Sequence, residues 1–489
     1  MKRRSLQRFL RIILIPFGII LMLFTACTRE PEVIRTVTEK TEPVSESESE
    51  STEDPEAREE SASENTADTE SESESETESS EETETAAPKN SHEGEAVFFG
   101  HYMNADIAAL NQRTLNSEGA HLYDVLSEPS FSAESVRALI EAYSFPETAY
   151  LGGEPRTDDR TWEIMENRNL SALSEENFGI RYALLTDNAD VRAFPTMLPA
   201  KNELTEESFD LLQESGFSLG EGVIVLHESA DGAFLFVQGS NYSGWIEREK
   251  AAFCGFSEFS EYLSAEDFIV VLKQRFMLNS RALRLGTVLP YRERTEEGFT
   301  VLLPERSESG ELIIREEMVP DDPQSVSDGF LPYSVEDLTN RSFTLTGFPY
   351  GWGDTNQYYD CSSTAGLLYQ CYGIRLPRNT SWMKGFDGGG TYAVSLEGLS
   401  DEEKLSLIAA HPGAVLVMSG HAMIYGGTRT DEEGNLHYMV VHSNSGYYDS
   451  PAADVFHPVY ATVEADLLGL YRADGTLFLS AVHTLLYYE

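Results

Sequence analysis

The sequence predicts a multidomain α+β protein, and three observations carry that prediction. The chain has 489 residues, too many for one hydrophobic core and suited to about three domains of roughly 100–200 residues each. An acidic low-complexity stretch separates the N-terminus from the remainder, so the folded part is expected to begin near residue 93. Within that part, helical spacing gives way to short strands, and then to a cysteine-bearing helix followed by apolar strands.

The first residues have the composition of a secretory signal. Five Lys and Arg residues precede the apolar run Ile12–Leu23, and a small residue, Ala26, stands before Cys27. This ending is similar to a bacterial lipobox, with Phe24 where leucine is usual. We therefore expect residues 1–27 to be a lipoprotein signal in which Cys27 is lipidated, holding the protein at the outer face of a bacterial cytoplasmic membrane. An uncleaved transmembrane anchor is the alternative, but the run is shorter than the roughly 20 residues that span a bilayer.

Residues 28–92 form an acidic segment that is most uniform from Thr38 to about Thr85, where Ser, Glu and Thr dominate. This composition cannot bury a core and repels itself, so we expect a disordered linker that acts as a spacer. A cation-binding brush is the alternative, although no ordered ligand spacing supports it. The formal net charge of the chain is −48, more than this segment supplies. An acidic folded part argues against nucleic acid as a partner, which would require clustered Lys and Arg.

Four cysteines are too few for a disulfide framework. Apart from Cys27 and Cys361, we expect Cys254 and Cys371 to be small core residues, because Cys371 lies ten positions after Cys361 on one predicted helix. No His/Cys cluster has zinc spacing, and no phosphate-binding glycine loop stands out, so no metal or other cofactor is predicted.

Residues 93–176 have a mainly helical pattern without a chemical motif. The candidate helices are Asp106–Asn111 and Ser132–Ile140, and the candidate caps are Ser132 and Ser135.

Short strands follow in two sets, each expected to form a small barrel. In the first set, residues 177–256, an Asp-Gly turn at Asp231 joins two strands, and the closing segment Asn241–Ile246 resembles a bacterial SH3 domain. Residues 257–325 are interpreted as a second SH3-like barrel. The predicted strands are Tyr182–Thr186, Asp190–Thr196, Gly222–His227, Ala233–Gln238, Phe268–Leu272, Leu285–Thr287 and Phe299–Leu303.

Cys361 begins an apparent helix that Gly373 ends, and Asp360 is positioned as its N-cap. A thiol on the first helical turn lies at the positive end of the helix dipole, which favours the nucleophilic thiolate. The alternative is an inert buried cysteine, since free Cys is among the most buried residue types. The local pattern does not separate the two.

Two histidines downstream favour a catalytic role for Cys361. His421 opens a short strand, and His442 ends a second strand that starts at His437. A cysteine nucleophile needs a base for its proton and a polar group that orients the base, and these residues could supply both. His437 is the poorer candidate because its odd offset places it on the opposite face from His442.

Together these motifs resemble the NlpC/P60 family of cell-wall peptidases, which have a circularly permuted papain-like fold. The residues that carry the resemblance are Tyr350-Gly351-Trp352-Gly353, Asp360-Cys361-Ser362-Ser363, Leu376-Pro377-Arg378-Asn379-Thr380, Gly420-His421 and His442. It implies a catalytic domain over 326–489, with Cys361 as nucleophile, His421 as base and His442 as the orienting residue. The sequence departs from the family where Ser363 replaces a glycine and where Trp382-Met383 replaces a stretch that often holds glutamine.

The resemblance also implies a substrate, and it covers most of the chain after about residue 96, including a helical domain before two SH3-like domains. It implies hydrolysis of the bond between γ-D-glutamate and the following diamino acid in peptidoglycan stem peptides. Asp360, Ser362 and Tyr350 would hold the terminal amine of the peptide, in addition to the capping role of Asp360. Tyr242 is the candidate barrel residue that would face the substrate, and its favoured alternative is an ordinary core or surface tyrosine. The barrels would either bind the wall or close one end of the groove, which would admit only short peptides with a free N-terminal L-Ala. The alternatives are a catalytically inert wall-binding lipoprotein, and an amidase or acyltransferase on the same fold.

Overall fold

The computed structural model describes residues 94–117, 119–385 and 393–488. The predicted lipoprotein signal and acidic linker, residues 1–92, lie outside the described residues. Within the described ranges, no helix is both long enough and apolar enough to cross a bilayer.

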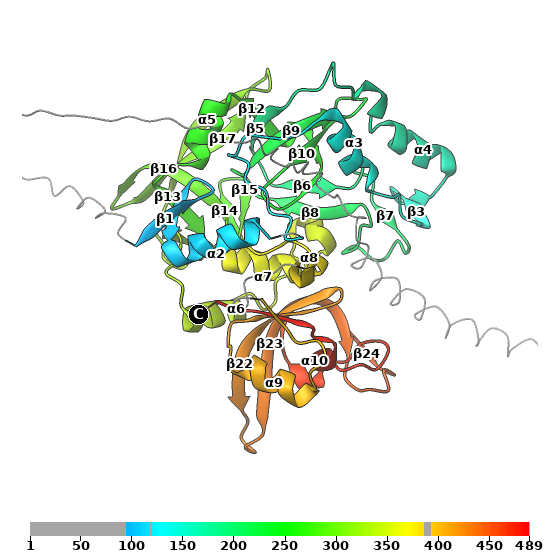
Figure 1. The fold of residues 1–489 in the computed structure, drawn as a ribbon, viewed down its shortest axis with the longest axis vertical. Coiled ribbons are helices and arrows are strands. Elements are labelled where there is room, and N and C mark those ends of the chain that lie inside the picture. The colour runs from blue at the N-terminus through cyan, green and yellow to red at the C-terminus, as the bar shows by residue number, and fades with distance from the viewer. Residues whose placement is uncertain (1–93, 118, 386–392, 489) are drawn as a thin grey trace, which may run out of the picture. The chain divides into compact units, whose positions relative to one another are not determined.

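The first strand set forms a seven-stranded sheet with the order β12-β5-β9-β10-β11-β6-β8 (Figure 1). Its strands are β5 (Arg181–Leu185), β6 (Ala189–Arg192), β8 (Gln213–Phe217), β9 (Gly222–Glu228), β10 (Phe234–Gln238), β11 (Ser243–Glu247) and β12 (Ala251–Cys254). The sequence predicted β5, β6, β9, β10 and β11 near these positions. It did not predict β8, because Gln-Glu-Ser-Gly-Phe has no run of β-branched residues. We call this the first sheet.

The second strand set forms a five-stranded sheet with the order β18-β17-β16-β13-β19, beside the hairpin β14-β15. The strands are β13 (Phe268–Val271), β14 (Arg275–Leu278), β15 (Arg281–Arg284), β16 (Val288–Thr295), β17 (Gly298–Arg306), β18 (Leu312–Val319) and β19 (Val326–Asp328). The predicted strand at Leu285–Thr287 is wrong. Gly286 has a φ of +74°, so this tripeptide forms the turn after β15. We call this sheet with its hairpin the second sheet.

The C-terminal part contains a six-stranded sheet with the order β20-β25-β21-β22-β23-β24. Its strands are β20 (Ala393–Ser395), β21 (Val415–Met418), β22 (His421–Thr430), β23 (Leu436–Tyr448), β24 (Phe456–Asp466) and β25 (Thr484–Leu486). Its helices are α6 (Val335–Thr344), α7 (Cys361–Gln370), α8 (Thr380–Gly385), α9 (Asp401–Ala409) and α10 (Phe478–Ala481), with short 3-10 turns η3 (Trp352–Gln357) and η4 (Leu467–Gly469). Alternate residues of β21 and β22 enter different cores, one shared with α7 and one on the opposite face with α10.

The N-terminal part mixes helices with short strands, so the expectation of a mainly helical pattern was incomplete. The elements of this part are β1 (Glu95–Phe98), β2 (His101–Asn104), α2 (Ala105–Leu115), α3 (Ala133–Glu141), β3 (Tyr150–Leu151), β4 (Glu154–Pro155), α4 (Asp158–Glu166) and η1 (Leu170–Ala172). The short elements β7 (Ala200–Lys201), η2 (Arg248–Lys250) and α5 (Phe256–Leu263) come later in the chain, among and after the strands of the first sheet. Both predicted helices are present as α2 and α3. Ser132 caps α3, whereas Ser135 is the third helical residue of the same capping box.

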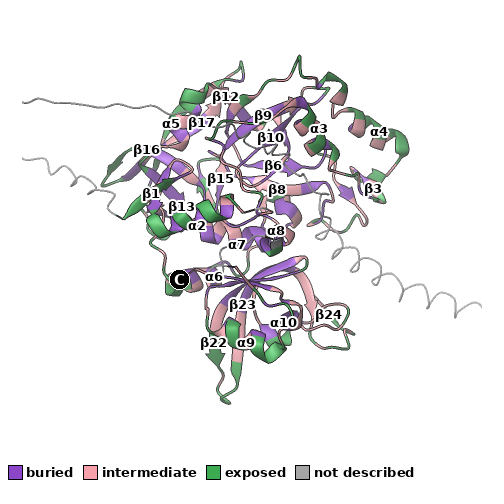
Figure 2. Cartoon of the chain, viewed as in Figure 1, coloured by how far each residue is buried: buried purple, intermediate pink, exposed green. Residues whose placement is uncertain are grey.

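One hydrophobic core joins three regions around α7. It contains residues from α2, from β13 of the second sheet and from β21 and β22. Asn111 of α2 adds a buried polar link, because its side chain donates to the Gly373 carbonyl at 2.7 Å and accepts the Arg375 N–H at 2.9 Å. The central strands are largely buried (Figure 2). The helix that carries Cys361 is therefore enclosed by parts of the chain that lie far apart in sequence.

The two remaining described cysteines differ from each other. Cys371 is fully buried, as expected of a core residue. Cys254 is half-buried at the end of β12, on the edge of the first sheet, and packs against a core cluster without lying fully inside it.

Candidate active site

Cys361 occupies the first turn of α7. Asp360 precedes it with an extended backbone, and its Oδ1 accepts the Ser363 N–H at 2.8 Å, which confirms the predicted N-cap. Cys361 is buried, and its thiol lies at the backbone N–H of Ala422, the second residue of β22. The fold therefore sets the cysteine against the strand that His421 opens.

The two predicted histidines meet on neighbouring strands. His421 is the first residue of β22, and His442 lies within β23. Their Nε2 and Nδ1 atoms are 2.7 Å apart, and both side chains are buried. Cys361, His421 and His442 are thus gathered at one place, with a direct hydrogen bond between the imidazoles.

The strand that carries His442 is longer than predicted. The sequence indicated an end at His442, but β23 continues to Tyr448 because these residues pair with β24. The extension starts with the polar residues Ser443 and Asn444, which give no apolar strand signal.

His437 lies apart from this pair, near the start of β23. Its two ring nitrogens contact Asp466 at 2.8 Å and Asp431 at 3.2 Å, and the side chain is partly exposed. The structure therefore gives it a role in the surface polar network, in agreement with its lower rank as a candidate.

Burial sets the charge states of the cysteine and the histidines. It raises the pKa of Cys361 to about 12, and the neighbouring Asp360 carboxylate adds to the rise. Burial, followed by His442, holds the pKa of His421 well below its usual value, and burial lowers the pKa of His442 to about 4. Burial and Asp360 therefore act on the Cys361 thiol in the direction opposite to the helix terminus. In the free protein, burial favours the neutral forms of Cys361, His421 and His442.

Arg378, from the Leu-Pro-Arg segment, links the first sheet to the nucleophile turn. Its guanidinium forms a bidentate ion pair with Asp360 at 3.1 and 2.8 Å, and donates to Ser362 Oγ at 2.8 Å. Its Nε donates to Ser215 Oγ on β8 at 2.8 Å. All four side chains are buried, and Arg378 lowers the pKa of Asp360 against the effect of burial. Two predicted amine-binding residues, Asp360 and Ser362, thus already contact an arginine.

Tyr242, which directly precedes β11, is buried in the core of the first sheet and does reach this region. Its ring lies 5.2 Å from that of Trp382, and its hydroxyl donates to Glu214 Oε2 at 2.7 Å. Trp382 also stacks on His121, with centroids 4.2 Å apart. Glu214 lies on β8, which no sequence signal indicated. It is partly exposed, and burial raises its pKa to about 7. Tyr242 and Trp382 therefore contact each other, as expected if the first sheet borders the site.

Tyr350 is buried near the same sheet. Its ring centroid lies 5.6 Å from that of Phe209, and its N–H donates to the Tyr460 carbonyl at 3.0 Å. It precedes a segment in which Gly353 and Asp354 have φ values of +56° and +69°.

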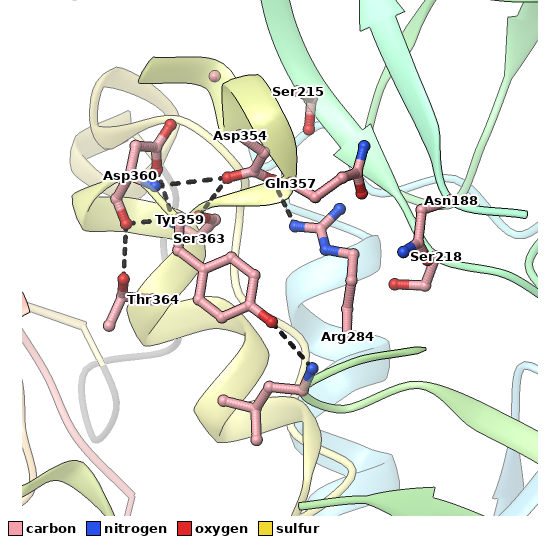
Figure 3. A network of polar contacts seen from close by, with 12 residues as sticks. Asn188, Ser215, Ser218, Arg284, Asp354, Gln357, Tyr359, Asp360, Ser363 and Thr364 are labelled. Carbon is pink, nitrogen blue, oxygen red and sulfur yellow. Dashed lines mark hydrogen bonds and ion pairs between the residues drawn. The ribbon is translucent and has the colours of Figure 1, made fainter. Parts of the chain in front are cut away.

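Asp354 is a buried residue that the sequence analysis did not single out (Figure 3). Its Oδ1 accepts from Ser363 Oγ at 2.5 Å and from the Asp360 N–H at 3.4 Å. Its Oδ2 forms an ion pair with Arg284 of β15 at 2.5 Å. Ser363, where the family often has glycine, thus supplies a hydroxyl to this network. No signal in the sequence connects residues 70 positions apart in this way.

The described residues contain no group of three or more His, Cys, Asp or Glu side chains arranged to hold a metal ion.

Comparisons with known proteins agree with this architecture. Residues 199–247 match the SH3 domain family (SH3b1 type) and lie inside the first predicted barrel. Among solved structures, an NlpC/P60 endopeptidase from Photobacterium damselae subsp. piscicida is similar at 18% identity and a TM-score of 0.55, over 74% of this chain and 86% of that one. NlpC2 from Trichomonas vaginalis aligns at 12% identity over 63% of this chain and 98% of that one, with a TM-score of only 0.23. No curated protein matches the sequence significantly. The chain thus combines an SH3 domain of the SH3b1 type with the fold of an NlpC/P60 endopeptidase.

Proposed function

We propose that this chain is a cysteine endopeptidase that hydrolyses the γ-D-glutamyl–diamino acid bond of peptidoglycan stem peptides. Cys361 is the nucleophile, His421 the base and His442 the residue that orients it. The hydrogen bond of 2.7 Å between His421 and His442, beside a cysteine on the first turn of a helix, is the observation that carries the proposal. The fold shared with an NlpC/P60 endopeptidase supports it.

The contact between the imidazoles determines which nitrogen acts as the base. When His421 Nε2 carries the proton and donates to His442 Nδ1, the Nδ1 atom of His421 retains its lone pair. That atom takes the Cys361 proton as sulfur attacks the peptide carbonyl. Because burial favours the neutral thiol and imidazole, we propose that proton transfer accompanies the attack, as in a serine–histidine pair.

The remaining steps follow from the same groups. The Cys361 N–H, unpaired in the first turn of a helix, stabilises the oxyanion, with Tyr350 as a second donor. His421 then protonates the leaving amine as the C–N bond breaks and a thioester forms. Water hydrolyses the thioester, and its proton returns through His421 to the thiol.

The end of the substrate with a free amine would lie against the first sheet. An ammonium group is attracted by carboxylates and hydroxyls. Asp360 is already paired with Arg378, whereas Glu214 contacts the hydroxyl of Tyr242 and is partly exposed. We therefore assign Glu214 and Tyr242 to the ammonium of the terminal L-Ala, next to Ser362, Asp360 and Tyr350. Contacts between the first sheet and the catalytic part support the closed-groove role of the first barrel.

Mass spectrometry of L-Ala-γ-D-Glu-diaminopimelate incubated with the chain tests the proposal. The amino-acetylated peptide and a Cys361→Ala variant serve as controls. We expect cleavage of the free-amine peptide only, and none by the variant. If the purified chain cleaved neither this peptide nor polymeric peptidoglycan, the proposed activity would be wrong, and wall binding without catalysis would replace it.

We further propose that residues 1–27 direct export and that lipidated Cys27 anchors the enzyme at the outer face of the cytoplasmic membrane, with the acidic segment as spacer. Metabolic labelling with a lipid probe tests this, because the Cys27→Ser variant should lose the label.

A further inference from the structure

The second sheet contacts both ends of the nucleophile helix α7. At the C-terminal end, Gln370 Nε2 donates to the Gly286 carbonyl at 2.8 Å, in the turn after β15. A side chain at position 286 would place its Cβ 3.0 Å from the Leu367 carbonyl oxygen, so the turn lies tightly against the helix. Backbone atoms of the turn after β15 therefore contact the C-terminal half of α7 directly.

At the N-terminal end, the contact is made by Arg284 and its neighbour. Arg284 is 2% exposed, and its guanidinium lies 5.4 Å from the ring centroid of Tyr359 while it pairs with Asp354. The N–H of Leu285 donates to the Tyr359 hydroxyl at 3.0 Å. Tyr359 is two residues before Cys361, so these contacts reach the segment that places the nucleophile.

Asp354 passes this restraint to the first turn of α7 (Figure 3). One of its oxygens faces Arg284, and the other accepts from the Ser363 hydroxyl and the Asp360 N–H. Asp354 itself has a φ of +69°, in the left-handed region that aspartate adopts more readily than most non-glycine residues. Arg284 thus pairs with a residue that in turn contacts Asp360 and Ser363, which lie on either side of Cys361 and Ser362.

Gly216 of the first sheet provides the space for this arrangement. A Cβ at position 216 would lie 2.4 Å from Arg284 Nη1 and 3.1 Å from the Asp354 Cβ. The guanidinium therefore passes against bare backbone of β8 on its way to Asp354, and a larger residue there would displace it.

We propose that Arg284 is a positioning residue for Cys361, holding Asp354 and Tyr359 so that the first turn of α7 presents the thiol to His421. The second sheet thus holds in place the helix turn that carries the nucleophile. The inference rests on the proposed function for its kinetic test, since turnover reports whether the thiol is placed correctly. Small displacements of a reacting group cost much more in turnover than in binding.

The test compares kcat and KM of full-chain variants on the free-amine peptide. Arg284→Met should lower kcat about a hundredfold with KM changed less than about threefold. Arg284→Lys, which keeps the charge beside Asp354, should restore at least about a tenth of the wild-type kcat. Arg281→Met is the matched control, because Arg281 lies on the same strand and pairs with Glu305 at 3.1 Å within the second sheet. Its kcat should be unchanged.

Two further variants keep the inference testable if Arg284→Met does not fold. Asp354→Asn removes the charge that Arg284 holds, and Gly216→Ala displaces the guanidinium without removing it. Each should lower kcat at least about tenfold while KM stays near wild type. Normal kcat in these two variants, with melting temperatures like that of wild type, would overturn the inference.

A second readout separates this inference from the proposed activity. If wild type cleaves no peptide, the proposed function fails, and the rate of Cys361 alkylation by iodoacetamide, followed on the Cys361 peptide by mass spectrometry, still reports the position of the thiol. We expect that rate to change at least about threefold in Asp354→Asn and not in Arg281→Met. Equal rates in all three proteins would overturn the positioning role.

Discussion

The first and second sheets both contact the catalytic part, but they do so with different kinds of groups. The first sheet contributes polar side chains, among them Ser215, Glu214 and Tyr242, beside the predicted substrate residues. The second sheet contributes a buried arginine and backbone atoms to the two ends of α7. The two sheets therefore have different roles at the site. The first borders the predicted substrate position, and the second supports the helix that carries the nucleophile.

This difference has a kinetic consequence. Changes to Glu214 and Tyr242 should act mainly on KM, because these side chains lie where the bound peptide is expected. Changes in the second sheet should act mainly on kcat, because they alter the geometry of attack.

The largest effect is expected where both regions converge, at Cys361. Cys361→Ala should lower turnover by roughly 10⁴-fold or more, because the nucleophile is removed. The melting temperature should change little, since only one buried sulfur is lost. Initial rates and a thermal melt measure the two quantities, and appreciable turnover in the variant would reassign the nucleophile.

Removing Arg378 should break the link between the first sheet and the nucleophile turn. Arg378→Met leaves the buried Asp360 carboxylate without its cation, so the free energy of unfolding should fall by about 3–5 kcal/mol. Urea denaturation measures this loss. Arg315→Met is the control, because Arg315 pairs with Glu305 and Glu317 at the surface, and its loss should cost less than about 1 kcal/mol. Equal losses in the two variants would show that the buried link is unimportant.

Tyr242→Phe tests whether the first sheet contributes to substrate binding. It removes the hydroxyl that contacts Glu214 but keeps the ring against Trp382. We expect KM for the free-amine peptide to rise about tenfold, as for loss of a hydrogen bond to a charged group, with kcat nearly unchanged. A fall in kcat with normal KM would place Tyr242 in the support of the nucleophile instead.

The smallest effect is a dependence of binding on pH. Burial raises the pKa of Glu214 to about 7, so its carboxyl group is neutral below that pH and charged above it. If the carboxylate binds the substrate ammonium, KM should fall as pH rises through about 7, a few-fold at most because Glu214 is partly exposed. The range below about 7.7 is informative, where the peptide amine remains protonated. Glu214→Gln should remove this dependence, and a KM in wild type that does not vary with pH would exclude Glu214 from amine binding.

Local signals predicted much of the site. Asp360 as N-cap, Cys361 on the first turn and His421 at the start of a strand all follow from residues adjacent in the chain, and the structure shows each of these placements. His442 was also named from its strand, and the motif resemblance implied its orienting role; the structure places it in contact with His421. The charge states were not predictable, because they depend on how deeply the groups are buried.

The secondary-structure elements and the chemical groups that they carry follow largely from the sequence alone, since helix caps, turns and apolar spacing act over a few residues. Only the tertiary structure decided that β8 brings Glu214 and Ser215 to the site, and that Arg284 reaches Asp354 across 70 residues. It also decided that Cys361 is buried beside Asp360, and both effects raise the pKa of its thiol. Burial and long-range ion pairs depend on which distant segments pack together, and no local pattern in the chain records that choice.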